Sequence, residues 1–152
     1  CKIGTSARID NIEPLTDGRM NISIHGENRF KMTGSLERVP YPQSAVLYMD
    51  TFEKIDDHLC NEIIERFKEY IKLTASANGD WINKVPFPRY QSKLSYKIGH
   101  LLPIPLDQKQ LLLEIPTETE RLQKELHIIK TLTQKTTNML QRNNAFTGFS
   151  KN

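Results

Sequence analysis

The sequence predicts an α+β protein in which the strands come first along the chain and the helices follow. Two observations support this prediction: apolar residues alternate with polar ones over the first 50 residues, and they recur at helical spacing beyond that point. Segregation of this kind favours a sheet or partial barrel beside a helical bundle. We expect a β lobe over residues 1–50, a helical lobe over residues 51–142 and a frayed tail over residues 143–152.

The first two predicted strands form a hairpin. Apolar and polar residues alternate over residues 3–9, and Met20, Ile22 and Ile24 form a second alternating set. Between them lies Asp17-Gly18, a pair that readily supplies the positive φ of a hairpin turn. The two strands should therefore pair antiparallel, each with one face buried.

Two shorter strands complete the predicted β-meander. Residues 25–28 are typical of a second turn or a bulge, and a short strand is predicted at residues 29–32. The prolines within residues 40–42 interrupt the ladder, because proline has no amide hydrogen to donate. A last strand is predicted within residues 44–49.

A long helix is predicted next, from Asp50 to about Leu73. Asp50 and Glu53 have the spacing of a capping box, and residues 74–80 have turn composition. The predicted apolar face consists of Ile55, Leu59, Ile63, Phe67 and Ile71, flanked by Cys60, Ile64 and Tyr70.

Three more helices are predicted beyond the turn. The second runs over residues 89–102 and ends at Pro103 and Pro105. The third begins near Asp107, which has capping-box spacing with Gln110. The fourth begins at the capping pair Thr117 and Glu120, with an apolar face of Leu122, Leu126, Ile129 and Leu132.

Composition excludes several classes of protein. With 38% hydrophobic residues, a net charge of +3 and 2 cysteines, the chain is neither a disordered polymer nor a disulfide scaffold. The longest strictly apolar runs, such as residues 111–113, are far below the roughly 20 residues of a membrane span, so no membrane association is expected. Cys60 is expected to be a buried free thiol, which favours a cytoplasmic location. Because the charges are mixed, nucleic acid is an unlikely partner.

The motifs of catalysis are missing from the sequence. The glycines are scattered without a phosphate-binding loop, and the histidines lack metal-ligand spacing. Ser95 and Lys97 have the spacing of a Ser-Lys pair, but they lie in a predicted amphipathic helix and are interpreted as part of its solvated face. The sequence therefore predicts no enzyme activity, no metal and no cofactor in this chain.

Three aromatic residues in irregular surroundings are the candidate binding residues: Tyr41, Trp81 and Phe87. Large apolar side chains on loops can line a surface for extended or unfolded peptides. The alternative is that they fill the seam between sheet and bundle. An open strand edge is a second possible binding device, since it can accept a peptide by strand addition, but the sequence does not say which edge is open.

Several segments resemble the substrate-binding (N-terminal) domain of Lon proteases and its standalone relatives. The hairpin carries GTSARI at residues 4–9, DGR at 17–19 and GENRF at 26–30. A more specific match is LLPIPLDQKQLLLE at residues 101–114, and the resemblance extends over residues 3–132. Residues beyond Asp80 look closer to standalone members of the family than to the protease.

The resemblance implies a PUA-like β pseudo-barrel followed by a helical bundle. It also implies binding of unfolded protein substrates, with the ATPase and Ser-Lys peptidase domains of Lon outside this chain. The family's upstream strand, with an FPL and LFPG pattern, has no counterpart here, and residue 1 is Cys, not Met. We therefore expect a missing N-terminal portion and an incomplete barrel.

Three functions follow as hypotheses. The first is a non-catalytic module that recognises unfolded or exposed apolar segments of client proteins, with a protease as a candidate partner. The second is the N-terminal fragment of an ATP-dependent Lon serine protease. The third, RNA binding, depends on fold analogy alone. The first hypothesis names Tyr41, Trp81 and Phe87 as contact residues.

Overall fold

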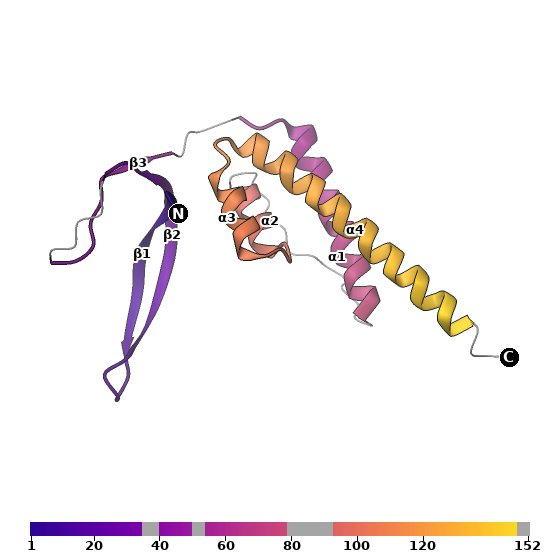
Figure 1. Cartoon of the computed structure of the whole chain (residues 1–152), viewed down its shortest axis with the longest axis horizontal. Helices are drawn as coiled ribbons and strands as arrows, with labels where there is room; N and C mark the ends of the chain where they lie inside the picture. The colour runs from indigo at the N-terminus through magenta and orange to yellow at the C-terminus, as the bar shows by residue number, and fades with distance from the viewer. Residues whose placement is uncertain (35–39, 50–53, 79–92, 149–152) are drawn as a thin grey trace. The chain divides into compact units, whose positions relative to one another are not determined.

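The computed structural model describes the backbone of residues 1–34, 40–49, 54–78 and 93–148, with side chains described as far as residues 77 and 142 in the last two ranges. The chain divides into two compact units, Cys1–Phe52 and Glu53–Asn152. The first is built from strands and the second from helices, as the sequence predicts (Figure 1).

The β unit is a long antiparallel hairpin with a short third strand. β1 (Ile3–Pro14) pairs with β2 (Met20–Met32), which pairs on its other side with β3 (Val46–Tyr48) (Figure 1). The predicted turn is confirmed: Gly18 has φ 84°, and the Leu15 N–H donates to the Arg19 carbonyl oxygen at 2.8 Å. In this order β1 and β3 are the two outer strands of the sheet that the described residues form.

The two strands predicted at residues 20–24 and 29–32 are one continuous strand, β2. The pairing register shifts between Thr5 and Ala7, where Ser6 lies opposite two residues of β2. The Ser6 hydroxyl closes this bulge, because its Oγ donates to the Asn28 carbonyl and accepts from the Asn28 N–H, both at 3.2 Å. Residues 25–28 therefore form the predicted bulge without ending the strand.

The helix predicted from Asp50 begins later and ends later. Residues 50–53 lie outside the described residues, and α1 runs over Asp57–Asn78. Asp56 acts as its cap, since its Oδ1 accepts from the His58 N–H at 3.1 Å. Residues 74–78, which were predicted to form a turn, continue the helix, because Ala75 is buried and the Thr74 hydroxyl donates to the Tyr70 carbonyl.

The remaining helices lie close to their predicted positions. α2 (Leu94–Leu101) and α3 (Leu106–Glu114) are separated by the two prolines, and α4 covers Glu118–Gly148. The Thr117 hydroxyl accepts from the Glu120 N–H, which confirms the predicted cap of α4. Asp107 does not cap α3: the residue before that helix is Pro105, and no side chain caps it. α4 includes residues 143–148, the first part of the segment predicted to be a frayed tail.

The core of the helical unit lies between α1 and α4, with α2 and α3 packed against α4. Its members follow the apolar faces that the sequence predicts, and Cys60 is a fully buried free thiol. The buried residues of the cluster are Cys60, Ile63, Phe67, Tyr70, Leu94, Ile98, Leu102, Leu122, Leu126 and Ile129. Burial raises the pKa of the Cys60 thiol, so it packs as a small apolar side chain.

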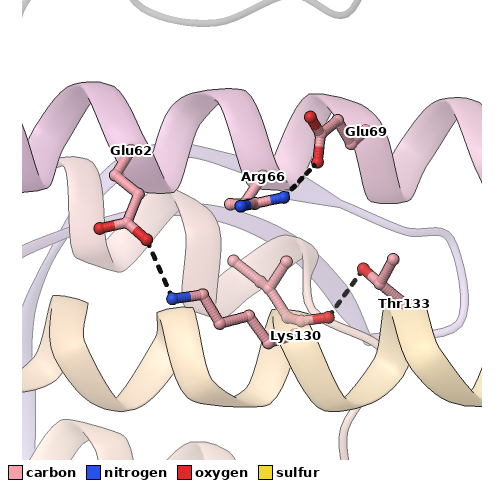
Figure 2. A network of polar contacts seen from close by, with 6 residues as sticks. Glu62, Arg66, Glu69, Lys130 and Thr133 are labelled. Carbon is pink, nitrogen blue, oxygen red and sulfur yellow. Dashed lines mark hydrogen bonds and ion pairs between the residues drawn. The ribbon is translucent and has the colours of Figure 1, made fainter.

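An ion pair joins α1 and α4 at their solvated edge. Lys130 Nζ lies 2.9 Å from Glu62 Oε1, and the two helices run side by side at this point (Figure 2). Along α1, Arg66 Nη1 lies 3.1 Å from Glu69 Oε2, and along α4 the Thr133 hydroxyl donates to the Ile129 carbonyl at 2.9 Å (Figure 2). These polar contacts border the apolar interface that holds the helices together.

Among the residues whose side chains the structure describes, four polar or charged ones are buried: Arg29, Ser95, Arg121 and Glu125. Ser95 was predicted to lie on a solvated face with Lys97, and this prediction is wrong for Ser95, whose exposed fraction is 1%. The reason is that α2 presents Ser95 to α4, where Glu125 accepts its hydroxyl hydrogen at 3.0 Å. Lys97 is exposed as predicted.

Candidate functional site

The β1–β2 hairpin carries an exposed apolar face. Ile9 pairs directly with Ile24, and Ile12 pairs with Ile22. Residues 22 and 24 lie on one face because successive strand residues alternate, and their partners share that face. The pairs Ile9–Ile24, Ile12–Ile22 and Pro14–Met20 together form what we call the hairpin apolar face.

A bulge at Asp10 makes this face continuous. Ile9 and Ile12 are three residues apart, a spacing that places two residues of a regular strand on opposite faces. The register shifts between Ile9 and Asn11, so Asp10 is an extra residue in β1. This one-residue insertion brings Ile12 to the same side as Ile9.

The sequence pattern predicts that this face is buried, and that prediction is wrong. The exposed fractions are 55% for Ile9, 52% for Ile22 and 59% for Ile24. Among the described residues of the β unit, β3 pairs only with the end of β2, at residues 30–32, and leaves the isoleucines uncovered. Clustered exposed apolar residues of this kind mark interaction surfaces more often than single ones do.

The opposite face of the hairpin is polar. It pairs Arg8 with His25, Asn11 with Ser23 and Glu13 with Asn21. Arg8 also forms ion pairs with Asp10 at 3.1 Å and with Glu27 at 4.0 Å. The hairpin is therefore amphipathic. Charged side chains lie on the polar face, and none lies among the paired residues of the apolar face.

The ends of the hairpin are fixed by local contacts. At the tip, Arg19 Nε donates to Asp17 Oδ2 at 2.8 Å and its backbone N–H donates to Oδ1 at 3.0 Å. These hydrogen bonds lower the pKa of the Asp17 carboxyl below its ordinary value. At the base, Phe30 covers Gly4 so closely that a Cβ on residue 4 would lie 3.0 Å from Cζ of the ring.

β1 also offers an open edge. It is an outer strand, and in the part of the chain that the structure describes no strand pairs with its outer side. Such an edge presents backbone N–H and C=O groups to an incoming extended peptide. The edge and the hairpin apolar face belong to the same strand, so one ligand can use both.

Of the three aromatic residues predicted to bind clients, the structure describes one. Tyr41 is 63% exposed, in the segment between β2 and β3. Trp81 and Phe87 lie outside the described residues, so a shared surface of the three aromatics stays a prediction.

The isoleucines of the hairpin were missed because alternation was interpreted as burial. The spacing of Ile9 and Ile12 is the signal that indicates the bulge.

The helical unit has smaller exposed features. A shallow, mostly apolar hollow on α4 is lined by Ile115, Pro116, Glu120, Gln123, Lys124 and His127. Among the described residues, no three His, Cys, Asp or Glu side chains gather as metal ligands. In the same residues, no helix is both long and apolar enough to span a membrane.

Comparison with known proteins gives a consistent match. The family model of the ATP-dependent protease La (LON) substrate-binding domain matches residues 1–131. A Lon protease of Brevibacillus choshinensis is 26% identical over 125 residues, which are 80% of this chain and 16% of that protein. A Lon protease of Halothermothrix orenii is 28% identical over 132 residues, 84% of this chain and 17% of that protein. The chain thus spans about a sixth of the length of these relatives.

Two solved structures share the fold. The N-terminal domain of a Mycobacterium avium complex Lon protease has a TM-score of 0.56 and 21% sequence identity, covering 85% of this chain and 70% of that one. A Lon N-terminal domain protein from Xanthomonas campestris has a TM-score of 0.60 and 16% identity, covering 84% of this chain and 68% of that one.

Proposed function

The chain belongs to the family of Lon substrate-binding domains, and from this premise we propose that it is a non-catalytic module that binds unfolded or exposed apolar segments of client proteins. The observation that carries the proposal is the hairpin apolar face, which is exposed and free of charged partners on its own side. Unfolded chains differ from folded ones in displaying apolar segments, so a surface of this kind selects them without reading a sequence.

The open edge of β1 gives the same surface a means of holding a client. An extended segment that pairs with β1 gains backbone hydrogen bonds, while its apolar side chains lie over Ile9 and Ile12. Backbone pairing tolerates many sequences, and the apolar contacts select the segments. Tyr41, Trp81 and Phe87 remain the aromatic contacts that the sequence suggests.

Binding of an unfolded polypeptide by the full chain tests the proposal. Ile22→Thr/Ile24→Thr keeps β-branched side chains in β2 while reducing the apolar surface of the face. Loss of roughly 1 kcal/mol of contact at each position should weaken binding of reduced, carboxymethylated casein about tenfold or more, as measured by fluorescence anisotropy. The matched control is Asn21→Thr/Ser23→Thr, on the opposite face of the same strand.

Equal affinities for the two double variants would contradict the proposed surface. Degradation of casein by the purified chain would contradict its non-catalytic nature. Replacement of Tyr41, Trp81 and Phe87 by Ser is a separate test, in which loss of the folded far-UV signal would assign them to the core.

A second candidate is the N-terminal fragment of an ATP-dependent Lon serine protease. It is favoured by the relatives, which are named Lon protease and of which the chain spans 16% and 17%. In that case the same surface would present clients to chemistry supplied by other domains. Reading the gene on both sides of these 152 residues tests it, since a phosphate-binding GxxxxGK[ST] loop downstream would decide for the protease.

A further inference from the structure

A buried relay of polar groups joins α2 to α4. Arg121 Nε donates to Ser95 Oγ at 3.2 Å, and Ser95 Oγ donates in turn to Glu125 Oε1 at 3.0 Å. The other carboxyl oxygen, Glu125 Oε2, is buried and has no hydrogen-bond partner. The exposed fraction of Glu125 is 1%, so bulk solvent does not reach this carboxyl group.

The packing brings the backbone of α2 close to the carboxyl group. A Cβ on Gly99 of α2 would lie 3.1 Å from Glu125 Oε1, so the helix backbone approaches the carboxyl directly. This site favours the neutral carboxylic acid over the carboxylate. The charged form would lose its hydration and would receive a hydrogen bond at only one of its two oxygens. Burial accordingly raises the pKa of Glu125 to about 8.

The charged neighbours do not reverse this effect. On α4, Arg121 lowers the pKa of Glu125 and Glu118 raises it, and both are weaker influences than burial. On α1 the titratable groups in the core are the Cys60 thiol and the Tyr70 hydroxyl, and burial raises the pKa of both, which keeps them neutral. The other titratable groups on α2 and α3 are at least partly exposed: Tyr96, Lys97, His100, Asp107, Lys109 and Glu114.

α2 has little local support of its own. It has eight residues, and Lys93 before it has φ 64° and no side-chain cap. A non-glycine residue at positive φ is strained, and a helix of two turns is marginal without packing. Leu94, Ser95 and Ile98 are its buried anchors, and Ser95 is the one that hydrogen-bonds to Glu125.

We propose that Glu125 is a proton-controlled lock that holds α2 against α4 while it is protonated and releases α2 when the proton passes to solvent. The lock belongs to the helical unit and does not depend on the hairpin apolar face. Release exposes the apolar anchors of α2, so this unit changes from a closed to an open surface across the mildly alkaline range.

Hydrogen exchange of the α2 amides in the full chain tests the lock. If opening restores the ordinary pKa of 4.5 to Glu125, the opening constant should rise on the order of 50-fold between pH 6 and pH 8. Exchange is followed by mass spectrometry, with labelling times corrected for the intrinsic effect of pH. Glu125→Gln imitates the neutral acid and should reduce the change to less than about twofold. Glu120→Gln, an exposed position on the same helix, should exchange like the parent protein.

The same pH dependence in the parent protein and in Glu125→Gln would overturn the proposal. A ¹³C NMR titration of the Glu125 carboxyl in the unaltered chain gives an answer that needs no variant. A transition near pH 8 that coincides with loss of α2 protection supports the lock, and a transition below pH 5 overturns it.

Discussion

Phe30 of β2 lies across from Gly4 of β1 and covers it, so that a side chain on residue 4 would meet the aromatic ring at 3.0 Å. Gly4→Ala should therefore force the ring to shift and destabilise the β unit by about 1 kcal/mol. Amide exchange of β2 measures the loss. Phe30→Leu should remove most of the added cost in the double variant, and an unchanged cost there would contradict a ring contact as its cause.

A substitution at the turn residue Gly18 should act through backbone conformation and not through a steric clash. Its φ is 84°, and a Cβ on it would meet no atom within 4 Å. Gly18→Ala should destabilise the hairpin by about 1 kcal/mol because alanine is strained at positive φ. Gly18→Asn should cost less, since asparagine adopts this conformation more readily. Equal losses for the two variants, measured by exchange of the β1–β2 amides, would contradict this explanation.

Substitutions at an exposed and at a buried isoleucine should differ in their effect on stability. Ile22 is 52% exposed and Ile63 is fully buried. Ile22→Thr should change the free energy of unfolding of its unit by no more than about 0.5 kcal/mol, whereas Ile63→Thr should cost about 2 kcal/mol or more. NMR amide signals report the two units separately during urea unfolding. A large loss for Ile22→Thr would show that the hairpin face is already covered.

The ion pair between Lys130 and Glu62 should have a small, salt-sensitive effect. The hydrogen bond from Lys130 lowers the pKa of Glu62, so the pair stabilises the fold above the unfolded pKa of 4.5 and the contribution is lost as the pH falls through the lowered value. Lys130→Met should return the pKa toward 4.5, as read by NMR titration of the carboxyl. The difference should shrink in 1 M salt, and its persistence there would argue against an exposed ion pair.

Glu125 predicts the opposite pH dependence for the helical unit. Its folded pKa of about 8 lies above the unfolded value of 4.5, so its contribution is fully present below pH 4.5 and is lost as the pH rises toward 8. Within that window the free energy of unfolding should fall by up to about 1.4 kcal/mol per pH unit. Urea unfolding of the parent protein and of Glu125→Gln from pH 5 to pH 9 measures it, and parallel curves would contradict the assignment.

Local chemistry explains what the sequence could predict of this fold. Asp17-Gly18 specifies its turn without help from distant residues, and the spacing of Leu122, Leu126 and Ile129 specifies one helix face. The start of α1 was predicted too early because the chain offers two capping signals, the pair Asp50 and Glu53 and the single residue Asp56. The hydrogen bond from the His58 N–H shows that Asp56 caps the helix. Competing local signals of this kind are resolved only by packing.

The candidate surfaces depend on tertiary relationships and were harder to predict. Alternation at Ile22 and Ile24 predicts that the two side chains share one face of the strand. The sequence of the strand does not determine whether another layer covers that face. Glu125 sits between Leu122 and Leu126 in the sequence and resembles an ordinary helix residue. Its burial follows from the close approach of Gly99, which lies on another helix.

The bulge at Asp10 makes the two strands of the hairpin respond differently to a change in length. Because Asp10 is the inserted residue, loss of its single codon would leave Ile9 and Ile12 two residues apart in a regular strand, and they would still share a face. Loss of Ser23 from the partner strand would instead make Ile22 and Ile24 adjacent and place them on opposite faces. One strand of the hairpin can therefore be shortened without dividing the hydrophobic surface, and the other cannot.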